Sequence, residues 1–183
     1  MANFDTLQVQ KLVRARGVYS GREQSVTGTL VVRAGTSVAL TDLIRAVPVG
    51  ENGRPIRVIV ASTPISGTPV LTNPTFNVGV APLGGTYTRL DGTTYPPLAA
   101  SAAILSPALV LAGDNMKQDI EVARPVADSI SNYGPFYVTL TPAGAGAFSV
   151  AGGDIELSVT VVLVGEENNN SIYTTYVNQK VSN

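Results

Sequence analysis

The stretch DIELSVTVVLV, residues 154–164, alternates apolar and polar side chains along almost its whole length. Successive side chains of a β-strand point to opposite faces, so this period of two is typical of a strand with one face in a core. The apolar face would hold Ile155, Leu157, Val159, Val161 and Leu163, and the polar face Glu156, Ser158 and Thr160. The sequence therefore predicts a half-buried strand here.

Earlier segments repeat this alternation, namely residues 26–32, 56–61, 76–80 and 136–141. Residues 36–49 are equally rich in β-forming residues, but their alternation changes phase near Thr41-Asp42, which predicts a bend or bulge there. Gly and Pro, 18 and 12 in number, separate these runs and do not cluster. About nine or ten short strands at this spacing predict an antiparallel sandwich or barrel.

Helix and loop signals are few. Residues 98–112 are the one segment that could form a helix, and Pro107 limits it to about two turns. Residues 82–97 are expected to form one long exposed loop. The chain shows no internal repeat, and we divide it into an N-terminal strand or arm (1–24), a β-sandwich core (25–164) and a C-terminal strand or arm (165–183).

Both ends of the chain carry alternating segments, residues 7–19 and 171–181. Such segments either complete the sheet of their own subunit or add strands to a neighbouring subunit. The candidate partner contacts in these ends are Lys11, Arg14, Arg16, Arg22, Tyr173 and Tyr176. The basic residues are sparse and the sequence pI is about 5.3, so an acidic protein surface or plain solvent is a better match for them than nucleic acid.

The composition excludes several classes of function. The chain has no Cys and no His, which removes disulfides, thiolate nucleophiles, histidine triads and the commonest transition-metal ligand. Its start lacks a signal pattern, and no apolar run is long enough for a membrane span. With 44% hydrophobic and only 14% charged residues, we expect a protein made in the cytoplasm that packs and binds, is not an enzyme and needs no cofactor.

Two pairs of carboxylates are the remaining candidates for catalysis. Asp119 and Glu121, like Asp154 and Glu156, are two residues apart and would lie on one face of a strand, roughly 6.5–7 Å apart. That separation overlaps the range of inverting glycosidases. It also occurs on any solvent-facing strand, which is the simpler interpretation.

Two loops carry weaker signals. The segment GEENNN, residues 165–170, gathers oxygen ligands but lacks the spacing of a calcium loop, so a solvated turn is expected. Gly144-Ala-Gly146 lacks the third Gly and the βαβ context of a dinucleotide site, so a hairpin tip is expected. Neither loop predicts a metal or cofactor.

One region resembles a known family. Residues 29–62 contain a D-x-I step at Asp42-Leu43-Ile44 and a V-P-x-G turn at Val47-Pro48-Val49-Gly50, and a later strand carries Asn77-Val78-Gly79. This pattern resembles small structural proteins of tailed bacteriophages, most of all head decoration or cement proteins. About 50 of the 183 residues carry the resemblance, and Asn77 stands where Asp is commoner in the pattern.

The resemblance implies an all-β, jelly-roll-like antiparallel sandwich with extended terminal arms. It also implies a decoration protein on the exterior of a virion, with the major capsid protein and copies of itself as partners, a trimer being favoured, and with no role for nucleic acid or membrane. One alternative is a tail or neck component. Another is a receptor- or carbohydrate-binding module, for which Tyr87, Tyr95 and Tyr133 could stack on sugars.

Overall fold

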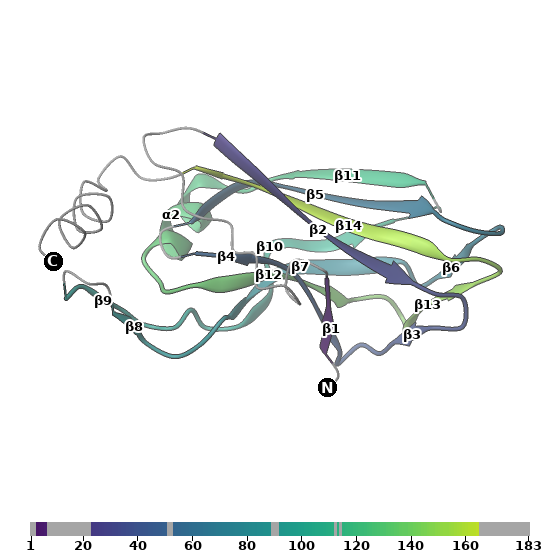
Figure 1. Ribbon diagram of the computed structural model, residues 1–183, viewed down its shortest axis with the longest axis horizontal. Coiled ribbons are helices and arrows are strands. Elements are labelled where there is room, and N and C mark those ends of the chain that lie inside the picture. Colours follow the sequence, from purple (N-terminus) through teal and green to yellow (C-terminus); the bar gives the residue numbers. More distant parts are fainter. Residues whose placement is uncertain are drawn as a thin grey trace, which may run out of the picture.

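The computed structural model describes residues 3–6, 23–50, 53–88, 92–111, 113 and 115–164. Two sheets form the body of the molecule (Figure 1). The larger contains β1 (Asn3–Asp5), β4 (Leu43–Val49), β12 (Phe136–Pro142), β7 (Thr75–Pro82) and β10 (Ser101–Val110), in that spatial order. The smaller contains β11 (Met116–Glu121), β5 (Arg54–Pro64), β14 (Ile155–Val164) and β2 (Glu23–Val32).

Eight of these strands form a jelly roll. In chain order they are β2, β4, β5, β7, β10, β11, β12 and β14. The first pairs with the last, the second with the seventh, the third with the sixth and the fourth with the fifth, and every pair is antiparallel. This nesting is the path of a ribbon rolled into two facing sheets. The all-β sandwich predicted from the sequence is therefore confirmed, and its topology is that of a jelly roll.

Strand β14 shows why the alternating sequence forms a sandwich. The side chains on its buried face are at most 1% exposed, and the residues between them are partly exposed: the buried ones are Ile155, Leu157, Val159, Val161 and Leu163. β14 is a central strand, paired with β2 on one side and with β5 on the other. Its buried side chains face those of the larger sheet, where Phe136, Val138 and Leu140 are equally buried.

A third, smaller sheet closes one end of the sandwich. It contains β3 (Ser37–Val38), β13 (Phe148–Ala151) and β6 (Val70–Thr72). Phe148 of β13 packs edge-on against Phe76, with ring centroids 4.9 Å apart. The helix α2 (Arg124–Ser131) lies at the opposite end (Figure 1).

The predicted change of phase in residues 36–49 is confirmed. β3 and β4 are separated by a turn in which the Asp42 backbone N–H donates to the Ala39 carbonyl oxygen at 3.0 Å. The Ala39 N–H donates to Asp42 Oδ2 at 3.1 Å. The Asp side chain closes the turn because it can accept from a backbone N–H three residues away.

The helix predicted over residues 98–112 is wrong. Residues Ser101–Val110 form strand β10, which pairs with β7 and shifts register twice. Pairing with β7 overrides the helix propensity of an Ala- and Leu-containing segment. The helix α2 was missed because it is only eight residues long and lacks a side-chain cap, although the Pro at its start is suited to a first helical turn.

Two further expectations need correction. Residues 82–97 are not one long loop, because β8 (Tyr87–Thr88) and β9 (Thr94–Tyr95) pair within them. The Gly144–Gly146 segment is not a hairpin tip. It connects β12 of the larger sheet to β13 of the end sheet, and these two strands are not paired with each other.

The N-terminal residues 3–6 lie at one edge of the larger sheet. β1 pairs with β4 in parallel, with Asn3 opposite Leu43 and Asp5 opposite Arg45. The predicted terminal segments 7–19 and 171–181 lie outside the described residues, so the boundaries of the two arms stay predictions.

Candidate functional site

The first carboxylate pair is held by an arginine. Arg57 Nε on β5 donates to Asp119 Oδ1 at 2.6 Å, and Arg57 Nη2 contacts Asp119 Oδ2. This hydrogen bonding, with the guanidinium charge, holds the pKa of Asp119 below its ordinary value. A general acid in glycoside hydrolysis needs a raised pKa. Asp119 therefore has the electrostatics of a surface ion pair, which are the opposite of those that a general acid needs.

In the second carboxylate pair, Asp154 and Glu156, Asp154 is hydrogen-bonded to two neighbouring loops. Asp154 Oδ1 accepts from the Ala34 N–H at 2.9 Å, and its carbonyl oxygen accepts from the Ile65 N–H at 2.9 Å. The Asp154 N–H donates to Ser66 Oγ at 3.2 Å. Asp154 thus ties together the chain after β2 and the chain after β5. Its partner Glu156 lies between Val31 and Thr63 in the strand register.

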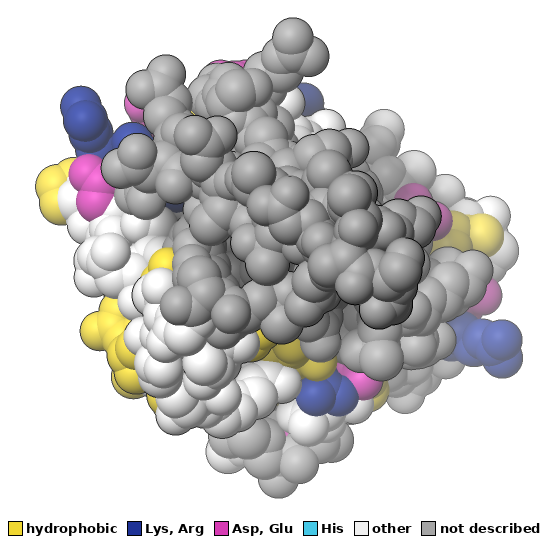
Figure 2. Space-filling view, turned by 60° about the vertical axis from the view of Figure 1, so that its left-hand side comes forward, with side chains coloured by type: hydrophobic (Ala, Val, Ile, Leu, Met, Phe, Trp, Pro, Cys, Tyr) yellow, Lys and Arg dark blue, Asp and Glu magenta, His cyan; other side chains and the backbone are white. Residues whose placement is uncertain are grey.

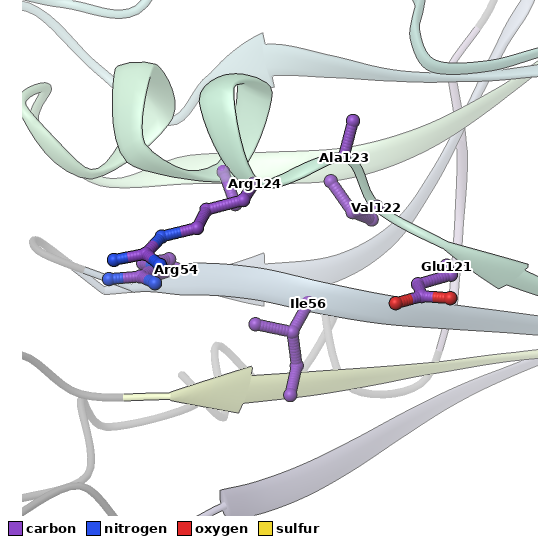
Figure 3. A pocket seen from close by; sticks show the side chains of 7 residues that line it. Arg54, Ile56, Glu121, Val122, Ala123 and Arg124 are labelled. Atoms are coloured by element: carbon purple, nitrogen blue, oxygen red, sulfur yellow. The ribbon is translucent and has the colours of Figure 1, made fainter.

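A hollow lies beside α2, between the helix and strands β5 and β11 (Figure 3). Its volume is about 370 Å³. The residues that line it are Arg54, Ile56, Glu121, Val122, Ala123, Arg124 and Ala127. Arg54 and Arg124 lie on one side of it and Glu121 on the other (Figure 3).

The two arginines of this hollow share one carboxylate. Arg54 Nε is 3.0 Å from Asp128 Oδ1, and Arg124 Nε is 3.6 Å from Asp128 Oδ2. Asp128 therefore offsets part of their charge and ties α2 to the start of β5. The described lining of the hollow therefore combines two arginines, one glutamate and four apolar side chains.

The three candidate sugar-stacking tyrosines are brought together only in part. Tyr87 and Tyr95 are register partners in the β8–β9 hairpin, and both are partly exposed. Tyr133 follows α2 and packs against the core. Two of the three side chains therefore share a hairpin, and the third contributes to the core.

The large exposed hydrophobic side chains of the described residues gather at one end. They are Val31, Leu40, Ile65, Val70 and Val110, each 44–58% exposed. Leu40 follows β3, Val70 begins β6, and Ile65 bonds to Asp154 just before β14. Val31 pairs with Glu156, and Val110 pairs with Thr75 at the start of β7. We call this region the apolar end; it surrounds the small sheet and lies away from α2.

The apolar end could not be predicted from the sequence. These five residues are far apart in the chain, and each looks like one more apolar residue of a strand. Only the pairing of strands places them at one end. Exposed apolar side chains indicate an interaction surface where they are contiguous, whereas single exposed residues are ordinary.

The centre of the outer face of the smaller sheet is uncharged, and its side chains are small, hydroxyl-bearing or aliphatic: Ser25, Thr27, Thr29, Ile59, Ala61, Ser158, Thr160 and Val162. The charged side chains of this face lie around that centre: Glu23, Arg57, Lys117, Asp119, Glu121 and Glu156. The Thr27 and Thr160 hydroxyls are hydrogen-bonded at 2.7 Å across β2 and β14. In the view of Figure 2, the charged side chains of the described residues lie in a few small groups in which blue and magenta are close together.

The predicted contacts Lys11, Arg14, Arg16, Arg22, Tyr173 and Tyr176 lie outside the described residues, as does the loop 165–170. Within the described ranges, no group of three or more Asp, Glu, His or Cys side chains could hold a metal ion. No helix in the same ranges is long and apolar enough to cross a membrane.

The comparisons with known proteins identify one structural likeness. No family model matches the sequence, and no curated protein matches it. A chain of a solved structure described as "Capsid of Ralstonia phage GP4" superposes with a TM-score of 0.59 at 15% sequence identity. The superposition covers 90% of this chain and 99% of that chain. At this identity the likeness concerns the fold, which the two chains share over almost their whole lengths.

Proposed function

We propose that the protein is a virion structural protein of a tailed bacteriophage, which decorates the capsid and cements it by packing across neighbouring capsid subunits. The observation that carries this proposal is the likeness of fold, over nearly the full length of both chains, to a chain from a phage capsid structure. The sequence resemblance in residues 29–62 supports the same role independently.

The surface chemistry supports a protein that acts by adhesion. The apolar end exposes five large aliphatic side chains, and the centre of the outer face of the smaller sheet is uncharged. Burial of apolar surface contributes about 25 cal/mol per Å², before the cost of association. Many copies, each binding weakly, would stabilise a shell together because every bound copy bridges subunits. In this proposal the protein has no catalytic activity.

The proposed partners are the major capsid protein and further copies of this chain, with a trimer favoured and the capsid exterior as the location. Residues Lys11, Arg14, Arg16, Arg22, Tyr173 and Tyr176 remain the predicted contacts of the two arms. A tail or neck position would use the same kinds of surface.

A receptor- or carbohydrate-binding role is the second candidate, and the β8–β9 hairpin favours it. Tyr87 and Tyr95 lie opposite each other there, both partly exposed. Adjacent aromatic side chains can stack on a sugar ring. A glycan array probed with the wild-type protein and with Tyr87→Ala, Tyr95→Ala would show selective binding that the double variant lacks.

The decisive experiment for the cement role uses capsid shells that lack this protein. Shells are mixed with purified protein, sedimented through a cushion and then heated while release of shell subunits is followed by light scattering. We expect co-sedimentation to saturate at a fixed number of copies and the shells to dissociate at a higher temperature. A correctly folded protein that stays in the supernatant at all concentrations would overturn the proposal.

A further inference from the structure

Residues 3–6 occupy a well-defined docking slot. Arg45 Nε donates to Asp5 Oδ1 at 2.6 Å and Arg45 Nη2 donates to Asp5 Oδ2 at 2.5 Å, so the two side chains form a bidentate ion pair. Thr6 is 1% exposed, and its N–H donates to the Arg45 carbonyl oxygen at 3.2 Å. Its hydroxyl donates to the carbonyl oxygen of Ala46. Phe4 packs against the core.

The slot lies between the two sheets. On one side is β4, whose backbone pairs with β1. On the other side is β2, where Gly28 leaves the space that Thr6 uses: a Cβ at Gly28 would lie 2.9 Å from Thr6 Oγ1 and would collide with the Ala46 carbonyl oxygen. Arg45 also makes a cation–π contact, because its guanidinium lies 5.2 Å from the centre of the Tyr137 ring. The Tyr137 ring thus gives the Arg45 guanidinium a second attractive contact besides Asp5.

The strand that fills the slot is an addition to the fold. The eight strands of the jelly roll pair with one another without β1. Among the described strands, β1 is the one that pairs in parallel, and it is only three residues long. Addition of a short extended segment to a sheet edge is a common way for one chain to bind another.

The link that follows is longer than docking within one chain requires. Residues 7–22 connect Thr6 to the start of β2 at Glu23. Thr6 lies beside Gly28, five residues along β2 from Glu23, so the link spans a distance of about 17 Å. Sixteen residues can reach about 50 Å. The slot of an adjacent copy could therefore also be filled wherever it lies within that distance of the start of β2.

We propose that this slot is a site of exchange between copies of the chain, in which residues 3–6 of one copy fill the slot of its neighbour. The same Asp5–Arg45 ion pair and the same Thr6 contacts then form between two chains, so the exchange loses no contact. High local concentration on a particle makes exchange more favourable there than in dilute solution. The inference rests on the self-assembly that belongs to the proposed function.

The test uses the absence of cysteine from the natural chain. Asn3 and Leu43 are opposite each other on β1 and β4. Paired residues of neighbouring strands have Cα atoms about 5 Å apart, which is within the Cα–Cα range of a disulfide. The double variant Asn3→Cys, Leu43→Cys can therefore form a disulfide wherever β1 fills the slot. The protein is oxidised both in concentrated solution and on capsid shells, and is then separated on a denaturing gel without reductant. Thr27→Cys, Thr160→Cys, on paired strands of the jelly roll, is the control for a bond within one chain.

Exchange predicts covalent dimers and larger species for Asn3→Cys, Leu43→Cys, while the control runs as a monomer and each single-cysteine variant stays uncross-linked. A monomeric cross-linked product in both samples would overturn the exchange. If that product is found on protein bound to shells, the cement role stands and only the exchange fails. If the protein does not bind shells, the sample in solution still decides the exchange.

Charge reversal gives a second test that does not depend on cysteine. Asp5→Arg places two positive side chains in the slot, and Arg45→Asp places two negative ones there. The arm is therefore repelled by the slot in either variant, and each variant alone should be monomeric by light scattering. Mixed in equal amounts, each arm meets an opposite charge only in the slot of the other variant. Restored oligomers in the mixture support exchange, and two folded variants that stay monomeric when mixed contradict it.

Discussion

Asn77 Oδ1 accepts a hydrogen bond from the backbone N–H of Ala108 at 2.9 Å. Ala108 has a φ of 50°, in the left-handed region that residues with a Cβ rarely adopt. It lies where β10 shifts register against β7, between the pairs formed by Ser106 and Leu109. The Asn77 side chain therefore supplies a bonding partner at a point where the regular ladder is interrupted.

This relationship predicts opposite effects for two substitutions. Asn77→Ala removes the acceptor for the Ala108 N–H and is expected to lower the free energy of unfolding by about 1 kcal/mol. Ala108→Gly relieves the left-handed conformation and should raise it by about 0.5 kcal/mol, since added freedom in the unfolded chain offsets part of the gain. Urea denaturation followed by circular dichroism measures both. Equal effects of the same sign would contradict this account of the bulge.

Gly28 is predicted to tolerate no larger residue. The Cβ of Gly28→Ala would collide with the backbone carbonyl of Ala46, and backbone cannot move aside as a flexible side chain can. We expect a loss of about 2–3 kcal/mol in the free energy of unfolding. Gly84→Ala is the matched control, because a Cβ there meets nothing within 4 Å, and it should change stability by less than about 0.5 kcal/mol.

The Arg57–Asp119 pair predicts a dependence of stability on pH. Because folding lowers the pKa of Asp119, the pair stabilises the fold at pH values above the ordinary carboxyl pKa, and this contribution is lost as the pH falls through the lowered value. Asp119→Asn should therefore lower the melting temperature more at pH 7 than at pH 2.5. Arg57→Gln added to Asp119→Asn should cause little further change. A difference between wild type and Asp119→Asn that is the same at both pH values would argue against this pairing.

The apolar end provides a test of adhesion in the proposed cement role. Ile65 and Val70 are 52% and 58% exposed, so Ile65→Ser, Val70→Ser should leave the fold intact. We expect the affinity for capsid shells to fall by about tenfold or more, because two aliphatic side chains lose their burial at the contact. Ser129→Ala, on the exposed side of α2 at the other end, is the control and should bind as the wild type does. Unchanged binding of the double variant would place the contact elsewhere.

Much of the fold could be predicted from local patterns. Residues 154–164 form a strand with the predicted buried face, because the direction of a side chain along a strand depends only on whether its position is odd or even. The bend before β4 was predictable for a similar reason, since the Asp42 side chain reaches a backbone N–H in its own turn. The strand at residues 101–110 could not be predicted, because their composition is compatible with a helix and the strand that pairs with them, β7, is set by the tertiary fold.

The amino-acid sequence by itself determined that this chain forms strands, which side of β14 is buried, and that histidine and cysteine chemistry is absent. Only the tertiary structure decided that β2 pairs with β14, that Arg57 neutralises Asp119, and that residues 3–6 fill a slot between β4 and Gly28. The physical reason is the range of the interactions. Periodicity and turn chemistry act between residues a few positions apart, whereas strand pairing, ion pairs and the apolar end depend on which distant segments the rolled chain brings together.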